Sequence, residues 1–169
     1  MKVLFIVPEI RLDSTPDNMP FWAGILAAIV ENKGGQVGIL DLNVLRMKYD
    51  GRQVPMKVIS EEISSEKWDL IGIGGLTTTY SRIKELCPLI KKCSPDSLLV
   101  AGGGWASYNP DEILQLVPEL DLICIGEGEE TFSEIYDEME HGTKDFERVN
   151  GLCLRDGKGF KFTGPRALI

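Results

Sequence analysis

The stretch Val3-Leu4-Phe5-Ile6-Val7, directly followed by Pro8, decides how the rest of the chain is interpreted. An uninterrupted apolar run of this length indicates a strand buried on both faces, as in a parallel sheet, because a one-sided strand would alternate apolar and polar residues. Acidic Glu9 comes next and no small-residue cleavage site follows. We therefore interpret the stretch as a first strand and not as a signal peptide.

Apolar runs of strand length alternate with segments of helical periodicity along the remainder of the chain. The first helix is expected to end at Lys33-Gly34-Gly35, where a cation precedes glycine. Pro88 is expected to kink a later helix or to shift its start. Asn109 has the context of an N-cap, and Thr131 that of a capping box which opens the last helix. The predicted strands are residues 3–7, 37–40, 70–74, 98–101 and 122–125, and the predicted helices begin near residues 21, 57, 82, 110 and 131.

This alternation predicts an α/β domain with a doubly wound, parallel five-stranded sheet. Parallel strands need crossover helices, and right-handed crossovers place helices on both faces. The flavodoxin-like (Rossmann-like) strand order 2-1-3-4-5 is the natural choice for five strands. Residues 152–155 and 160–162 predict a C-terminal β-hairpin with a turn of about four residues. We assign residues 1–145 to the α/β domain and residues 146–169 to the hairpin and a linker.

Composition limits the possible functions. The chain has 169 residues, 43% of them hydrophobic, which fits one globular domain. Its 18 basic and 26 acidic residues give a net charge of -8, the wrong sign for binding nucleic acid or an anionic membrane surface. The longest apolar run, residues 21–30, is about half of the roughly 20 residues that a membrane span needs. A cytoplasmic location is the resulting expectation.

The sequence offers few residues that could bind a metal ion or act in nucleophilic catalysis. No cysteine pair has C-x-x-C spacing, so the four cysteines are interpreted as buried thiols, and no metal ligands are predicted. The single histidine, His141, is expected to end a helix, because cations favour helix C-termini. No base stands at a suitable spacing from a serine, threonine or cysteine. We predict no catalytic residues in this chain.

Glycine marks the strand exits where ligands bind in such folds. Residues 74–75, 102–104 and 126–128 each follow a predicted strand, and the carboxyl ends of parallel strands meet at one edge of the sheet. Glycine there allows a ligand to approach the backbone, although tight strand-to-helix turns also use glycine. Three such exits at the same edge favour a ligand cleft.

The polar residues at this edge are mostly hydroxyls, including Thr77 and Thr78, which suit a large neutral ligand rich in amides. The Gly-x-x-x-x-Gly-Lys and Gly-x-Gly-x-x-Gly phosphate loops are absent, and so is the hydroxyl-rich loop of a flavin site. A phosphoacceptor receiver needs an acidic pair after the first strand, and Glu9 is alone there. The acidic residues Glu127 and Glu129 have no evident metal ligand set around them. They are expected to favour the N-terminus of the following helix instead.

A resemblance becomes specific when these motifs are taken together. Residues 20–28 are similar to the first helix of the cobalamin (B12)-binding domain at the N-terminus of many radical S-adenosylmethionine (SAM) enzymes. Asp41-Leu42-Asn43 falls at the Asp-x-His position of the wider B12 family, Gly74-Gly75-Leu76 at its Ser-x-Leu position and Gly102-Gly103 at its Gly-Gly position. Gly126-Glu127-Gly128-Glu129 with Thr131 is the most specific motif. The resemblance covers essentially the whole chain.

The resemblance implies cobalamin as the cofactor. Asn43 replaces the histidine that would ligate cobalt, which implies a base-off, His-off cobalamin. Its tail would enter the sheet edge between residues 76–79 and 102–104, with the corrin over the loops after the first two strands. The implied cofactor-binding residues are Asp41, Asn43, Gly74, Gly75, Leu76, Thr77, Thr78, Gly102, Gly103, Gly104, Trp105, Gly126, Glu127, Gly128, Glu129 and Thr131.

The resemblance also implies a partner. Anaerobic magnesium-protoporphyrin monomethyl ester cyclases and several methyltransferases share this N-terminal region. Their radical SAM domain carries a Cys-x-x-x-Cys-x-x-Cys motif, which this sequence lacks. The iron–sulfur cluster and SAM would therefore belong to a C-terminal radical SAM domain outside this chain, and whether the chain itself is an enzyme stays open. The alternative is a structural or docking domain of the same fold without a cofactor.

Overall fold

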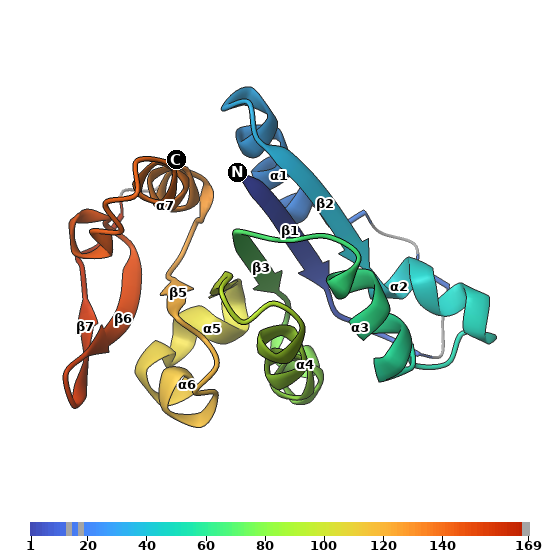
Figure 1. Ribbon diagram of the computed structural model, residues 1–169. Coiled ribbons are helices and arrows are strands. Elements are labelled where there is room, and N and C mark those ends of the chain that lie inside the picture. Colours follow the sequence, from blue (N-terminus) through green and yellow to red (C-terminus); the bar gives the residue numbers. More distant parts are fainter. Residues whose placement is uncertain (13–14, 17–18, 167–169) are drawn as a thin grey trace.

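A computed structural model of the chain describes residues 1–12, 15–16 and 19–166. Within this part the strands form one sheet in the order β2-β1-β3-β4-β5-β6-β7 (Figure 1). The first five strands are parallel, and β6 and β7 are antiparallel to their neighbours. The strands are β1 (Lys2–Val7), β2 (Gln36–Asp41), β3 (Leu70–Gly74), β4 (Leu98–Gly102), β5 (Leu122–Cys124), β6 (Leu152–Asp156) and β7 (Gly159–Phe162).

The predicted flavodoxin-like class is confirmed, but the sheet is larger than expected. The five parallel strands have the order 2-1-3-4-5, and the hairpin extends this sheet to seven strands within the described residues. Cys153 of β6 lies opposite Ile123 of β5. The sheet is larger because β6 of the hairpin pairs with the backbone N–H and C=O groups that β5 would otherwise expose at an edge. The hairpin loop is also shorter than expected, since Asp156 already pairs with Gly159. Ala167–Ile169 of the predicted linker lie outside the described residues.

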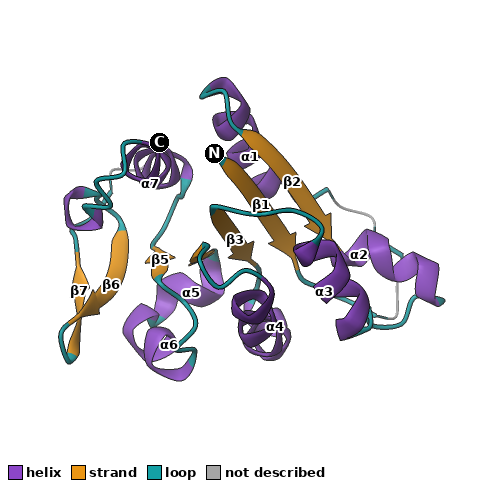
Figure 2. Cartoon of the chain, in the orientation of Figure 1, coloured by secondary structure: helices purple, strands orange, loops and turns teal. Residues whose placement is uncertain are grey.

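Helices cover both faces of the sheet (Figures 1 and 2). The helices are α1 (Phe21–Asn32), α2 (Leu42–Leu45), α3 (Met56–Ser64), α4 (Tyr80–Cys93), α5 (Gly104–Tyr108), α6 (Pro110–Leu116) and α7 (Glu129–Glu140), with 3-10 turns η1 (Arg46–Tyr49), η2 (Thr77–Thr79) and η3 (Phe146–Arg148). Val3, Phe5 and Val7 of β1 pack toward α1 and α7, whereas Leu4 and Ile6 pack toward α3 and α4. Two cores on opposite faces explain why every position of β1 from Val3 to Val7 is apolar.

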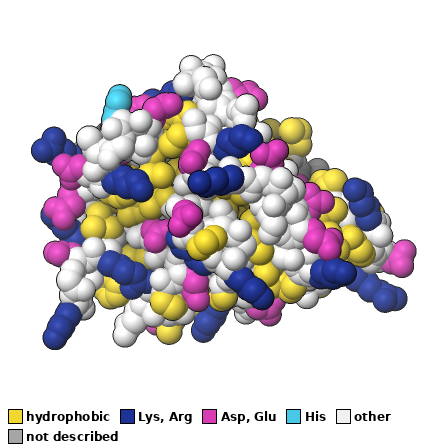
Figure 3. All heavy atoms as spheres, in the orientation of Figure 1, with side chains coloured by type: hydrophobic (Ala, Val, Ile, Leu, Met, Phe, Trp, Pro, Cys, Tyr) yellow, Lys and Arg dark blue, Asp and Glu magenta, His cyan; other side chains and the backbone are white. Residues whose placement is uncertain are grey.

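Several local predictions are corrected by the structure. The last helix begins at Glu129 and not at Thr131, because Glu129 and Glu130 already supply the acidic first turn that the helix dipole favours. α4 continues through Pro88 from an earlier start at Tyr80. The short helix α5, which opens on Gly104, was not anticipated. His141 does lie at the C-terminal end of α7, and Figure 3 shows it exposed.

A buried ion pair holds the loop after β1. The guanidinium of Arg82 donates from Nε to Glu9 Oε2 at 2.9 Å and from Nη2 to Glu9 Oε1 at 3.1 Å. The two side chains are only 8% and 2% exposed. The backbone N–H of Val54 also donates to Glu9 Oε1, and the Val54 carbonyl accepts from Arg82. Glu9 therefore connects three segments, namely the loop after β1, the segment at Val54 and helix α4.

Replacing Glu9 should destabilise the fold strongly. Glu9→Gln keeps the shape but leaves the buried Arg82 cation with only the exposed Glu85 as a carboxylate partner, at 3.2 Å, so the free energy of unfolding should fall by about 3–5 kcal/mol. Urea unfolding followed by circular dichroism measures this. Lys57→Gln is the control, since it breaks the exposed Lys57–Glu61 pair and should cost less than about 1 kcal/mol. Equal losses for the two variants would show that the buried pair is unimportant.

Candidate functional site

A cavity of about 660 Å³ opens at the carboxyl ends of the parallel strands. Its rim comes from the loops after β1 to β5, including Ile10, Asn43 and Leu76. From there it extends along one face of the sheet beneath α1 and α7. The deep wall consists of Phe5, Val7, Trp22, Leu26, Gly72, Val100, Cys124 and Phe132.

The floor of the deep part is made of small residues. Gly72 and Gly74 of β3, Gly102 of β4 and Cys124 of β5 face the same side as Leu70, because residues two apart in a strand share a face. A side chain on Gly72 would place Cβ 2.7 Å from the Phe5 ring, and one on Gly74 would place it 3.0 Å from the Trp22 ring. The aromatic rings thus lie directly over the bare backbone of β3.

One glycine is required by the backbone itself. Gly103 has φ +90, and a Cβ there would lie 2.7 Å from the carbonyl oxygen of Gly75. The exits of β3 and β4 are therefore in direct backbone contact. Gly102, its neighbour, is different, because a Cβ at that position would meet Cys124 at an ordinary 3.7 Å. A Cβ on Gly102 would therefore enter the cavity without a clash.

Asn43 uses both ends of its amide within the protein. Its Nδ2 donates to the Pro8 carbonyl at 2.9 Å and to Asp41 Oδ1 at 3.0 Å, and its Oδ1 accepts from the backbone N–H of Ile10 at 2.8 Å. Asp41 Oδ1 also accepts from the Asn43 backbone N–H at 2.8 Å, which caps α2. Asn43 and Asp41 therefore brace the loops after β1 and β2.

The loop after β5 offers an unused acceptor. Glu129 lines the cavity, and its Oε2 is buried with no hydrogen-bond partner among the described residues. The same loop is fixed to the exit of β4, since the Gly126 N–H donates to Ser107 Oγ at 3.0 Å and Ser107 Oγ donates to the Gly103 carbonyl. A ligand with N–H donors could satisfy the Glu129 oxygen.

Cys124 presents a protonated thiol to the cavity. Burial raises the pKa of this thiol to about 12, so at neutral pH it stays in the neutral form. Across residues 1–12, 15–16 and 19–166 no group of three His, Cys, Asp or Glu side chains is placed to hold a metal ion. No helix in that part of the chain is long and apolar enough to span a membrane.

The structure brings most of the predicted cofactor-binding residues together. Those in the cavity wall are Asp41, Asn43, Gly74, Gly75, Leu76, Gly102, Gly103, Gly104, Gly126, Glu127, Gly128 and Glu129. The exposed Thr77 and Thr78 lie on η2, outside the wall. Trp105 is buried beside Tyr80 in the core of the opposite face, with ring centroids 5.8 Å apart.

Thr131 also lies outside the wall. It is fully buried, and its hydroxyl donates to the Asn150 carbonyl at 3.0 Å. Phe5, Trp22, Gly72, Val100 and Phe132 belong to the wall but were not predicted. The available signal was strand alternation, since Gly72 shares a face with Gly74 and Val100 shares one with Gly102.

Comparisons with known proteins agree with this geometry. The family model of the B12 binding domain matches residues 10–136. An anaerobic magnesium-protoporphyrin IX monomethyl ester cyclase from Rubrivivax gelatinosus is 26% identical over 94% of this chain and 29% of its own length. A cytidylyl-2-hydroxyethylphosphonate methyltransferase from Streptomyces wedmorensis is 27% identical over 94% of this chain and 32% of its own length. The chain spans roughly a third of these relatives.

Solved structures share the fold. The radical SAM methyltransferase TsrM from Kitasatospora setae, with cobalamin and a 4Fe-4S cluster bound, superposes with a TM-score of 0.80 at 20% identity, over 99% of this chain and 29% of that one. The cobalamin-dependent SAM radical enzyme OxsB, with aqua-cobalamin and SAM bound, gives a TM-score of 0.82 at 19% identity, over 99% and 22% of the two chains. Since the family model matches well over half of the sequence, the chain belongs to the B12-binding domain family.

Proposed function

We propose that this chain holds cobalamin, base-off and without a histidine ligand, as the cofactor-carrying part of a radical SAM enzyme. The observation that carries the proposal is the cavity, which continues from its open rim over Gly102 and past the Phe5 and Trp22 rings into the space between the sheet and the helices α1 and α7. A flat corrin with a long tail needs both parts, a wide rim and a narrow slot.

The residues present fit such a ligand. Trp22 and Phe132 would flank the tail, and Gly102, which no ring covers, would let it approach the backbone of β4. The unpartnered Oε2 of Glu129 would accept an N–H from one of the amide groups around the corrin. When bound, cobalamin supplies a cobalt centre that can carry a methyl group.

Asn43 supports the His-off part of the proposal. Its amide nitrogen and oxygen are both engaged with the Pro8 carbonyl, Asp41 and the Ile10 N–H. The side chain that occupies the usual histidine position therefore holds the two loops beneath the corrin instead of reaching the metal.

The proposal extends to a catalytic partner. The relatives are cyclases and methyltransferases about three times as long as this chain. We propose that methyl transfer or radical chemistry is performed by a radical SAM domain that binds the iron–sulfur cluster and SAM, with this domain presenting the cofactor to it. A cofactor-free docking role is the competing outcome of the first test below.

Hydroxocobalamin binding tests the groove directly. The purified chain should co-elute with corrin absorbance on gel filtration, and Gly102→Leu should weaken binding by about tenfold or more, because leucine fills the slot. Gly24→Leu is the control, since Gly24 is exposed on α1 and a Cβ there meets nothing within 4 Å. Absence of binding by the unmodified chain would favour the cofactor-free role. Equal binding by both variants would place the tail elsewhere.

Cys124 should report occupancy of the same groove. Hydroxocobalamin should slow alkylation of Cys124 by iodoacetamide, while Cys93, outside the cavity wall, reacts unchanged. Because burial raises the Cys124 pKa to about 12, its rate without cofactor should rise roughly tenfold per pH unit from pH 7 to 10, as the thiolate fraction grows. Mass spectrometry of the alkylated peptides measures both rates. Unchanged Cys124 reactivity at saturating cofactor would contradict the assignment of the slot.

A further inference from the structure

The first turn of α7 has two functional sides. Glu129 and Phe132 face inward and belong to the cavity wall. Arg166, which lies in the segment after β7, contacts the other side of this turn. Figure 1 shows the chain returning from the hairpin to α7 at this point.

All three guanidinium nitrogens of Arg166 donate hydrogen bonds within the protein. Its two terminal nitrogens donate to the two carboxylate oxygens of Glu134, each at 2.8 Å. Nη2 also donates to the Asn150 carbonyl at 3.0 Å, Nε to Thr131 Oγ1 at 3.3 Å and Nη1 to Glu130 at 3.4 Å. The side chain is only 12% exposed. Such a bidentate contact fixes the orientation of the Glu134 carboxylate and also neutralises its charge.

Backbone contacts continue the same cluster to the end of β5. The Ile125 N–H donates to the Gly151 carbonyl at 2.8 Å, and the Gly151 N–H donates to the Gly164 carbonyl at 2.9 Å. Gly151 has φ +80, and a Cβ there would lie 2.7 Å from Thr131 Oγ1. Residues 163–166 are therefore joined to both ends of the cavity loop 126–129.

We infer that Arg166 and Thr131 are positioning residues for the cofactor cavity, and that they couple its occupancy to the placement of residues 163–166. Arg166 neutralises and orients Glu130 and Glu134, so that the first turn of α7 holds Glu129 and Phe132 at the wall. Thr131 links the guanidinium to the Asn150 carbonyl. The inference rests on the proposed function for its ligand, and it adds a route by which the cofactor acts on the segment that follows the hairpin.

Binding by paired variants tests the positioning role. Arg166→Gln and Thr131→Val should weaken hydroxocobalamin binding by about 5-fold or more, the lower end of typical coupling between sites. Thr131→Ser should restore binding to within about twofold of the unmodified chain, because it keeps the hydroxyl. Lys33→Gln is the matched control, since Lys33 pairs with Asp137 of α7 at 2.6 Å, outside the cavity wall. Equilibrium dialysis measures affinity, and thermal unfolding shows whether Arg166→Gln and Lys33→Gln lose similar stability.

Hydrogen exchange tests the coupling. Because linkage is reciprocal, hydroxocobalamin should slow amide exchange in residues 150–166 of the unmodified chain but not of Arg166→Gln. Unweakened binding by Arg166→Gln, or no change in residues 150–166 on binding, overturns the inference.

The two proposals can fail separately. If the unmodified chain does not bind hydroxocobalamin, the proposed function fails. The positioning role is then tested by amide hydrogen exchange measured without ligand. Faster exchange of residues 125–132 in Arg166→Gln than in Lys33→Gln supports it, and equal exchange contradicts it.

Discussion

The lack of side chains at Gly72 and Gly74 of β3 and at Gly102 of β4, all on one face of the sheet, is the constraint on which the site depends. Toward α1 and α7, β3 presents Leu70 at its start and then Gly72 and Gly74, so the face is bulky at one end and bare at the other. Helices pack tightly against a sheet only where side chains fill the space between them. Phe5 stands at the boundary, with its ring centroid 5.2 Å from Phe132 and 6.0 Å from Trp22. These rings hold the helices over the glycines, and the slot is the space that remains.

The exit loops around this slot are braced from their outer sides. Glu9 and Arg82 fix the loop after β1 to α4, Asn43 joins that loop to the exit of β2, and Ser107 joins the exits of β4 and β5. Each of these contacts uses a polar group that would otherwise be a candidate for ligand binding. The rim is consequently organised before any ligand arrives, which lowers the entropy cost of binding.

The fold was largely predictable because it follows from alternation, whereas individual roles were not. Apolar β1 and the glycine exits identified the sheet, its parallel strand order and the resemblance to the B12-binding family. The resemblance includes Thr131 among the cofactor-binding residues, but it cannot give the direction of a side chain on a helical turn, and the Thr131 hydroxyl donates to the Asn150 carbonyl outside the cavity wall. The pairing of β6 with β5 depends on a contact between segments far apart in sequence. Contacts between residues far apart in the chain produce no pattern in the neighbouring sequence from which they could be predicted.

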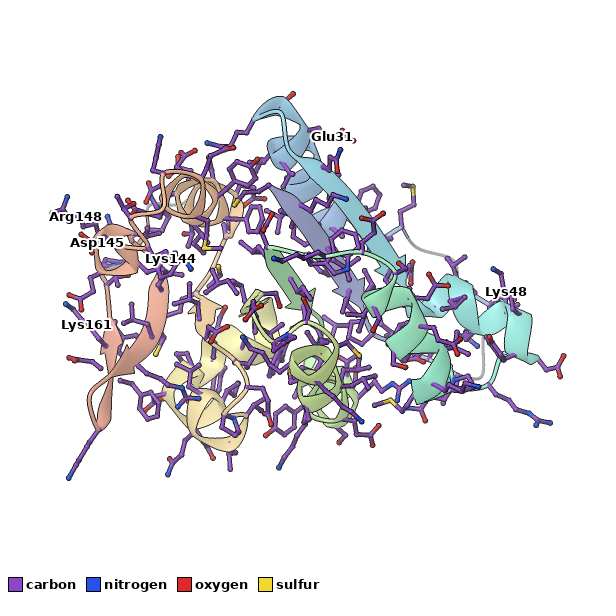
Figure 4. The ribbon with its side chains drawn as sticks, viewed as in Figure 1. Glu31, Lys48, Lys144, Asp145, Arg148 and Lys161 are labelled. Atoms are coloured by element: carbon purple, nitrogen blue, oxygen red, sulfur yellow. The ribbon has the colours of Figure 1, made fainter. Side chains whose placement is uncertain are left out.

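The charged side chains lie both around the surface and at the cavity, whose lining includes Arg11, Asp41, Arg46, Glu127 and Glu129. Figure 4 shows Lys144, Asp145, Arg148 and Lys161 gathered at the hairpin edge, with Lys48 at the opposite end of the molecule. In the face drawn in Figure 3, basic and acidic side chains are interspersed. At the cavity, Asp41 caps α2 and Arg46 donates to the Gly51 carbonyl at 2.7 Å. Glycines, aromatic rings and aliphatic side chains together make up most of the cavity lining, with Glu127 and Glu129 beside them. Because the charges in this lining are of both signs, the cavity has little of the single-sign field that long-range electrostatic steering needs, and shape and hydrogen bonding would dominate the recognition of a ligand.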